Sequence, residues 1–359
     1  MKKRANVSPQ ALECADLSAL WGGRQLAAAG GADRGRVLPG RTAQTCLRGP
    51  KPAAKIGGIL KWLVVFAAAA ALAEPPSGDA VIRAAAGKSE IVITTTTRCA
   101  GAIHSLTWGG REFIDSHDHG RQLQSASNLD LGSPILNETF NPTEAGSSRD
   151  GTGAKSSSVL LSLKAEGHAL ETVTRMAFWL APGERSGGQL AKNTTEVSEH
   201  LLTKRVRIGY RDLPHVISYD VTFTLPASER HTHAVFEALT GYLPPEFGRF
   251  LEFDPPTGEL AALSDGPGET PRPVVLATAN GAHAMGIFAP PQNAPHTTGP
   301  TFGRFRFSAE KVVKWNCVFR VRDDAGITPG EYPFRMFVIV GDVATVADSL
   351  RALHREFAR

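Results

Sequence analysis

Short runs of β-branched, aromatic and other apolar residues recur along this chain from residue 80 to residue 340, separated by Gly, Pro and Asn. Residues of the first kind suit the pleated, half-buried surface of a strand, whereas the separating residues favour turns. The runs comprise residues 91–97, 159–163, 172–180, 216–225, 230–242, 274–278, 284–288, 304–307, 312–321 and 332–340. Because little helical spacing lies between them, the sequence predicts an all-β protein, a large antiparallel β-sandwich.

One stretch near the end of the chain has the spacing of a helix. Its apolar residues, three or four positions apart, are Val346, Leu350, Leu353 and Phe357. Such spacing places them on one face of a helix, and Asp342 just before the stretch is a favoured N-cap residue. We therefore predict a C-terminal helix at residues 343–358, within a single β domain that spans residues 80–359.

The first 73 residues differ in character from the rest. Residues 1–50 show no sustained periodicity, and we expect them to be disordered or to come from a start codon assigned too early. Lysines then flank an apolar run that ends in the small-residue pattern Ala71-Leu72-Ala73. This arrangement is typical of a secretory signal peptide, here residues 51–73, and the run is short for a membrane span. The sequence thus predicts a secreted or periplasmic protein with no stable membrane anchor after cleavage.

Charge and cysteine content narrow the function classes. The formal charge of the 359 residues is +4, but beyond residue 73 there remain 28 Lys and Arg against 32 Asp and Glu. That part is mildly acidic, which argues against a nucleic-acid partner. Only Cys99 and Cys317 remain there. They could form one disulfide in an oxidising compartment or stay as two buried thiols, and the sequence leaves both alternatives open.

The stretch from residue 230 to residue 242 carries the strongest candidates for chemistry. In a strand, alternate side chains project to the same face, so His231, His233 and Glu237 should lie together. Two imidazoles and a carboxylate can shuttle protons, bind a metal or hold a sugar, although a solvated sheet face would look the same. We take Glu237 as the leading acid/base residue, Glu144 as its partner, and the two histidines as alternatives or orienting groups.

Polar residues gather in three other segments. The first, residues 101–124, contains His104, His119, Arg121 and Gln124; the second, residues 137–151, contains Asn141 and Glu144; the third, residues 312–320, contains Lys314, Asn316 and Arg320. In the third segment, alternation places these polar residues on one face and apolar residues on the other: Val313, Trp315, Cys317 and Phe319. We expect the named polar residues outside the catalytic set to bind substrate, although ordinary surface polarity would also account for them.

The first of these segments resembles a known family. The stretch Gly101-Ala102-Ile103-His104-Ser105-Leu106, followed by Gly110-Arg111-Glu112-Phe113, is similar to the opening hairpin of galactose-mutarotase-like proteins, which include aldose epimerases. The likeness extends over about residues 80–124. It implies the mutarotase-like supersandwich, a carbohydrate ligand, and a contact between Arg121 and a sugar hydroxyl. It does not indicate which later carboxylate would be the base.

These features together predict a carbohydrate-active protein, most simply an enzyme that uses acid/base chemistry for glycosidic hydrolysis, elimination or epimerisation. We expect Arg121, the loop around Asn141 and Glu144, and the face of His231, His233 and Glu237 to line one concave surface. One alternative is a non-catalytic carbohydrate-binding module. Another is a cupin-like enzyme in which His231, His233 and Glu237 bind a divalent metal; otherwise we expect no cofactor.

Overall fold

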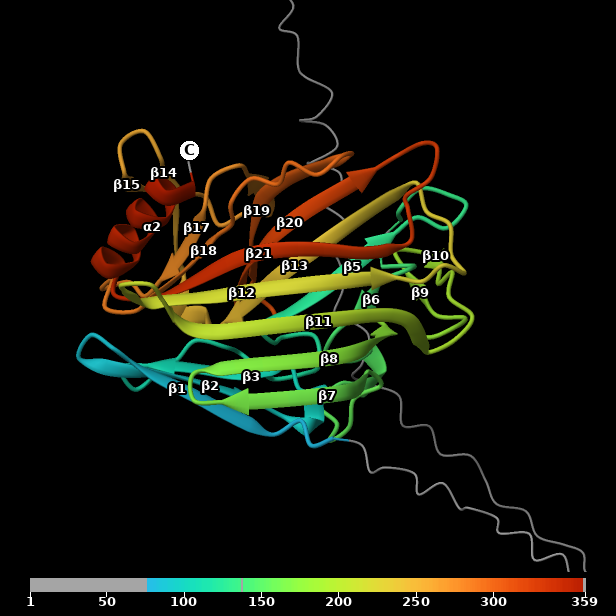
Figure 1. Cartoon of the computed structure of the whole chain (residues 1–359), viewed down its shortest axis with the longest axis horizontal. Helices are drawn as coiled ribbons and strands as arrows, with labels where there is room; N and C mark the ends of the chain where they lie inside the picture. Colours follow the sequence, from blue (N-terminus) through green and yellow to red (C-terminus); the bar gives the residue numbers. More distant parts are fainter. Residues whose placement is uncertain (1–75, 137, 358–359) are drawn as a thin grey trace, which may run out of the picture. The chain divides into compact units, whose positions relative to one another are not determined.

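The computed structural model describes residues 76–136 and 138–357, and these residues form strands joined by turns and loops (Figure 1). The predicted signal peptide at 51–73 and the segment 1–50 lie outside the described residues. The predicted fold class is confirmed, because the strands pair antiparallel and one helix closes the chain. In the described part of the chain, no helix is long and apolar enough to cross a membrane.

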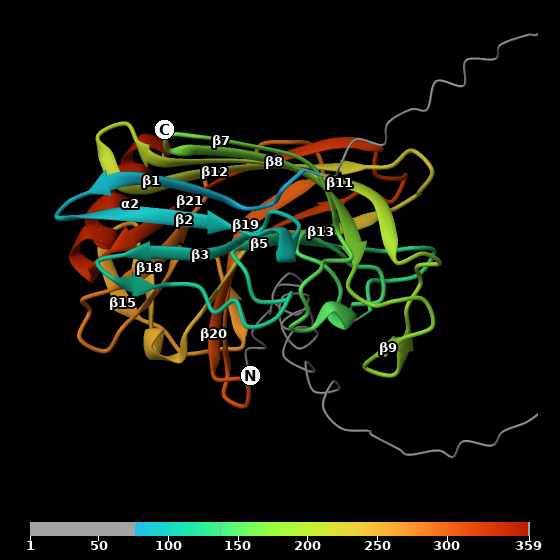
Figure 2. The same cartoon turned by 90° about the horizontal axis from the view of Figure 1, so that it is seen from below.

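A small sheet begins the fold. Its strands, in spatial order, are β1 (Ala80–Ala86), β2 (Ser89–Thr95), β3 (Ile103–Trp108) and β4 (Arg111–Glu112). Alternate residues such as Ile91 and Ile93 are fully buried, which explains why the β-branched run at 91–97 forms a strand. β1 contacts β7 (Val159–Glu166), β11 (Val197–Tyr210) and β12 (Leu213–Leu225) of the large sheet (Figure 2).

The large sheet has 15 strands and carries the site described below. Its other strands are β5 (Gln124–Leu129), β6 (Pro142–Thr143), β8 (Ala169–Phe178), β13 (His233–Leu243), β14 (Arg249–Asp254), β15 (Glu259–Ala262), β16 (Gly268–Thr270), β17 (Val274–Ala277), β18 (Ala284–Phe288), β19 (Thr297–Phe307), β20 (Val312–Arg322) and β21 (Gly330–Gly341). The spatial order is β15-β14-β17-β18-β21-β12-β11-β8-β6-β5-β13-β20-β19-β16, with β7 paired to β8. A separate hairpin comprises β9 (Arg185–Ser186) and β10 (Gln189–Leu190).

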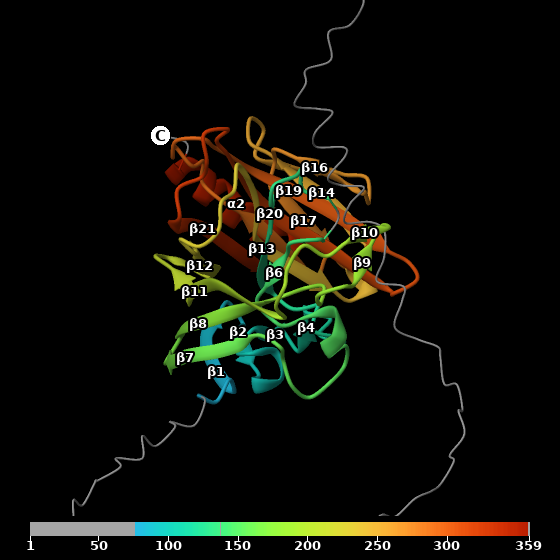
Figure 3. The same cartoon turned by 90° about the vertical axis from the view of Figure 1, so that its right-hand side faces the viewer.

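The two halves of the large sheet face each other across the main core. Figure 3 shows β11, β12 and β21 in one layer and β13, β19 and β20 in the other. Aromatic rings meet between the layers: the Phe223 and Phe236 rings lie 4.9 Å apart, and those of Phe319 and Phe334 lie 4.6 Å apart. These buried rings remove large apolar areas from water and so hold the layers together.

The helix α2 (Val343–Phe357) covers the outer face of one layer. Val346, Leu350 and Leu353 are buried and share a second apolar cluster with residues of β12 and β21. The Asp342 carboxylate accepts a hydrogen bond of 2.7 Å from the backbone N–H of Thr345, which is the predicted N-cap. The predicted C-terminal helix is therefore confirmed.

The two cysteines of the described part are free thiols. Cys99 and Cys317 are both buried and unpaired with each other, so the second of the two alternatives is found.

The start of β13 corrects one expectation from the sequence. This strand begins at His233, so His231 lies in the preceding turn and does not share the strand's alternation with Glu237. The turn is held by Asp130, whose carboxylate accepts hydrogen bonds from the backbone N–H groups of Thr232 and His233.

Candidate functional site

A β-bulge in β13 determines which side chains reach the outer face of its layer. The pairing of β13 with β20 shifts between Glu237 and Leu239, so Ala238 is an extra residue in the ladder. After the shift, Thr240 points to the same face as Glu237, whereas Leu239 is buried in the main core. Simple alternation would have placed Leu239 beside Glu237.

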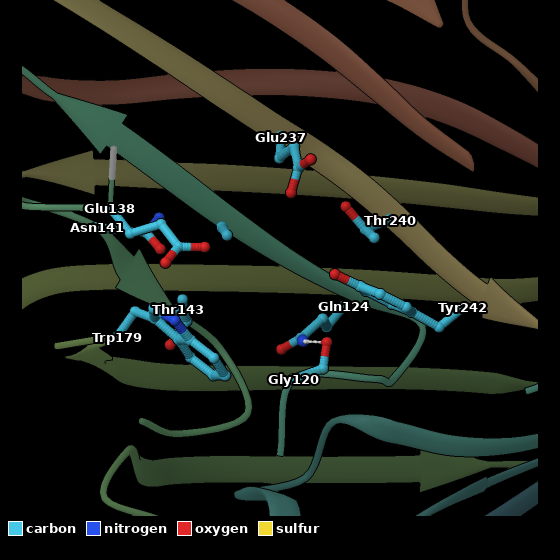
Figure 4. A pocket seen from close by; sticks show the side chains of 10 residues that line it. Gly120, Gln124, Glu138, Asn141, Thr143, Trp179, Glu237, Thr240 and Tyr242 are labelled. Atoms are coloured by element: carbon cyan, nitrogen blue, oxygen red, sulfur yellow. Dashed lines mark hydrogen bonds between the residues drawn. The ribbon is translucent and has the colours of Figure 1, made fainter. Parts of the chain in front are cut away.

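A pocket lies on this outer face, over β5, β6 and β13. Figure 4 shows its lining: Gly120, Gln124, Ala126, Glu138, Asn141, Thr143, Trp179, Glu237, Thr240 and Tyr242. Of the residues predicted to form the site, Glu237, Gln124 and Asn141 line it. The lining combines two carboxyl groups, two amides, two hydroxyls from threonine and two large aromatic rings. Such a mixture suits a ligand that has both hydroxyl groups and apolar ring faces.

Glu237 is the best-anchored acid of the pocket. Lys314 Nζ lies 3.0 Å from Glu237 Oε1, and Asn316 Nδ2 donates a hydrogen bond to the same oxygen. The amide of Asn316 is itself oriented, because its Oδ1 accepts a 2.9 Å hydrogen bond from the N–H of Gly303. Two residues of the predicted polar face of β20, Lys314 and Asn316, thus contact Glu237. The predicted apolar face of β20 lies in the core.

Lys314 is fully buried beside the carboxylate. Its ammonium group lies 5.1 Å from the Tyr242 ring centre and 5.2 Å from the Phe305 ring centre. Burial by itself lowers the pKa of Lys314, but the charge of Glu237 and the contact with Tyr242 outweigh it, so the pKa is raised. Lys314 therefore remains a cation and provides a fixed positive charge next to Glu237.

Glu138 is the second acid, and sequence reasoning did not select it. Removal of its carboxyl from water raises its pKa to about 7; Lys314 opposes the rise and Glu237 adds to it. Trp179 and Ser186 donate hydrogen bonds to the Glu138 carboxyl, which also oppose the rise. The pocket therefore contains one carboxyl with an adjacent cation and one that takes up a proton near neutral pH.

Glu144, the predicted partner of Glu237, lies on the other side of its layer. The neighbouring Thr143 faces the pocket, so the alternation of side chains turns Glu144 toward the core. There it forms a completely buried ion pair with Lys204 and accepts a 3.0 Å hydrogen bond from the N–H of Ser125. The prediction that Glu144 and Glu237 line one concave surface is therefore wrong.

The two histidines are also separate from the pocket. His231 is buried, and its ring contacts the backbone oxygen of Asp130 and the carboxylate of Glu229. His233 is half-buried at the start of β13. Within residues 76–136 and 138–357, the potential metal ligands that come together include His231 but neither His233 nor Glu237. The cupin-like ligand set is therefore not formed.

The remaining predicted contacts have other partners. Arg121 lies beside the pocket residue Gly120, but its guanidinium pairs with Asp118 at 3.0 Å and Asp115 at 3.7 Å. His119 bridges the backbone oxygens of Gly151 and Arg98 at 2.8 Å and 2.7 Å.

Two further predicted residues also lie away from this pocket. His104 is half-buried in β3, and burial lowers its pKa despite the nearby carboxylate of Glu112. Arg320 Nη2 donates to both carboxylate oxygens of Glu269, at 2.8 Å and 3.0 Å. Like Arg121 and His119, these two residues are not part of the pocket lining.

Comparison with known proteins gives likenesses of structure only. No protein-family model and no curated protein matches the sequence. Slr1438 from Synechocystis sp. PCC 6803 is similar with 8% identity and a TM-score of 0.41, over 73% of this chain and 96% of that one. A heparan sulfate lyase HepC mutant from Pedobacter heparinus has 9% identity and a TM-score of 0.37, over 74% of this chain and 35% of that one. An alpha-galactosidase from Lactobacillus brevis has 10% identity and a TM-score of 0.40, over 77% and 42%. Likenesses this low leave the function to be inferred from this chain's own pocket.

Proposed function

We propose that this protein acts on a carbohydrate and that its pocket carries out acid/base chemistry on one sugar unit. The observation that carries the proposal is the pairing, in one pocket, of Glu237 beside a buried cation with Glu138, whose pKa is about 7. Two carboxyl groups in one pocket, one of them with a raised pKa, are the usual means of donating and accepting protons at a sugar.

The roles follow from the surroundings of each group. Glu138 carries its proton up to about neutral pH, so it can donate that proton to the oxygen of the leaving group. Glu237 has the ammonium group of Lys314 beside it, and its carboxylate is the group that we assign to accept a proton or to stabilise positive charge at the sugar. Hydrolysis, elimination and epimerisation all use such a pair.

The rest of the pocket supports a sugar as the ligand. The rings of Trp179 and Tyr242 offer apolar surfaces against which a sugar ring can stack. The hydroxyl of Thr240 is buried and has no hydrogen-bond partner among residues 76–136 and 138–357. A buried hydroxyl without a partner costs free energy, so a ligand hydroxyl that contacts it would be bound favourably.

We also propose that the protein works outside the cytoplasm, as residues 51–73 indicate. A polysaccharide is too large to enter a cell intact, so export suits this substrate class. The linkage and the type of reaction are best identified by their products. We would incubate the full chain with a panel of polysaccharides and measure both reducing ends and unsaturated products.

The variant Glu237→Gln tests the assignment. Loss of a proton-transfer group lowers rates by about 10² to 10⁴, so turnover should fall by that factor while the fold is retained. Glu269→Gln is the matched control, because Glu269 is also a buried carboxylate with a cationic partner but lies outside the pocket lining. Unchanged turnover in Glu237→Gln would refute the proposal. Polysaccharide binding without any turnover would instead indicate a non-catalytic carbohydrate-binding module.

A further inference from the structure

We propose that His200, Glu229 and His231 form a binding site for a divalent transition-metal ion of the zinc class. One ligand atom from each of the three residues lies within 4.8 Å of the other two. Both histidines are buried, and the group lies apart from the pocket lining. Two imidazoles and one carboxylate are a ligand set that zinc accepts, with further positions for water.

The imidazole of His231 is oriented for this role. Its Nδ1 contacts the backbone oxygen of Asp130, which as an acceptor requires a proton on Nδ1. In the neutral ring, the lone pair is then on Nε2, and Nε2 is the atom that faces Glu229. A backbone carbonyl that fixes the far nitrogen of a histidine is the usual outer-shell partner at metal sites.

A single carboxylate oxygen faces both rings. Glu229 Oε2 lies 2.7 Å from His200 Nε2 and 2.9 Å from His231 Nε2. The atoms that would bind a shared ion are therefore His200 Nε2, His231 Nε2 and Glu229 Oε2, which already lie together.

The three ligands come from segments that a metal would tie together. His200 is on β11, Glu229 is in the connection after β12, and His231 lies two residues before the start of β13. The Glu229 side chain is 18% exposed, whereas both histidine rings are buried. Metal binding would therefore fix the connection between β12 and β13 against β11.

The proposed metal site also packs against the loop that supplies residues to the pocket. The Phe140 ring is 6.2 Å from the ring of His200 and 5.7 Å from that of His231, measured between centres. Phe140 is flanked by Asn141 and, two positions earlier, by Glu138, which both line the pocket. A metal on this side would steady the loop without touching the ligand.

The test uses Zn²⁺ alone with the full chain. After treatment with a chelator and removal of it, the protein should take up one equivalent of Zn²⁺ by calorimetry and retain it through gel filtration. Co²⁺ should give visible absorption typical of coordination by nitrogen and oxygen. His231→Gln and Glu229→Gln should each weaken Zn²⁺ binding by at least about 10- to 100-fold, the loss expected even for an outer-shell partner.

His215→Gln is the control, since His215 is also a buried histidine whose Nδ1 contacts a backbone oxygen, but among the described residues it belongs to no group of potential metal ligands. The His215→Gln variant should still bind one equivalent of Zn²⁺. Glu229→Gln is nearly isosteric, so circular dichroism of that variant separates loss of metal from loss of fold. Absence of Zn²⁺ uptake by the wild type, or equal uptake by the wild type and both variants, would overturn the proposal. Because metal content is the readout, the result is independent of whether the pocket turns over a carbohydrate.

Discussion

At the scale of single residues, the two pocket acids differ in the charges that surround them. Glu237 has the ammonium group of Lys314 at 3.0 Å, whereas Glu138 is desolvated and repelled by Glu237. The charge of Glu237 therefore adds to the rise in the pKa of Glu138, which keeps its proton up to about neutral pH.

The raised pKa of Glu138 predicts a pH dependence of stability. Its folded pKa of about 7 exceeds the ordinary value, so its contribution to stability is fully present at low pH and is lost as the pH rises through about 7. Glu138→Gln cannot ionise and lacks this loss. Urea unfolding from pH 5 to pH 8 should show the wild type losing free energy of unfolding relative to Glu138→Gln. Parallel curves for the two proteins would contradict the assignment.

Alternation along predicted strands was enough to find part of the site. It placed Glu237 on β13 and the supporting pair Lys314 and Asn316 on one face of β20, because each residue's direction follows from its neighbours in sequence. Glu138 and Trp179 could not be found in this way. They lie in a loop and at a strand end, and only the pairing of distant segments brings them to Glu237.

At the scale of elements, the bulge at Ala238 is a feature that the sequence pattern does not predict. The run from His233 to Leu243 is almost entirely buried, so its sequence does not reveal where the faces exchange. The strands and the C-terminal helix were predictable because their apolar spacing matches a period of two or of 3.6 residues. The extra residue in the ladder leaves no such signature.

The cap of α2 gives a prediction at this scale. The Asp342 side chain accepts a hydrogen bond from the N–H of Thr345, and this bond holds the pKa of Asp342 below its usual range. Asp342→Ala should lower the free energy of unfolding by about 1 kcal/mol, the typical cost of losing an N-cap. Asp342→Asn should retain most of the stability, because its amide oxygen can still accept. Thermal unfolding of both variants measures this, and a wild-type stability of Asp342→Ala would show that the cap is unimportant.

At the scale of the whole molecule, residues 51–73 predict export followed by cleavage after Ala73. Expression with the full leader should yield a secreted or periplasmic form that begins at Glu74, as N-terminal sequencing would show. Replacing Ala71 and Ala73 by leucine should block cleavage, because signal peptidases need small residues at these positions. An intact leader on the wild-type protein in the cytoplasm would exclude an extracellular role.

The ion pair of Glu144 and Lys204 links two segments of the large sheet that are not neighbours in it. It joins β11 to the segment after β6, across the intervening strand β8, and both side chains are completely buried. Burying two charges is costly, and their attraction offsets that cost only while both are present. Lys204→Met leaves the Glu144 carboxylate without its counter-charge and should cost about 3–5 kcal/mol of stability.

The double variant Lys204→Met with Glu144→Leu tests both the energetics and the function of this pair. Replacing a buried ion pair by apolar side chains is often neutral, so the double variant should regain most of the stability lost by Lys204→Met in urea unfolding. Since Glu144 faces the core and Glu237 faces the pocket, turnover should also be retained. If the double variant folds stably but has no activity, Glu144 contributes to the chemistry despite its burial. If Lys204→Met alone is as stable as the wild type, the pair does not stabilise the fold.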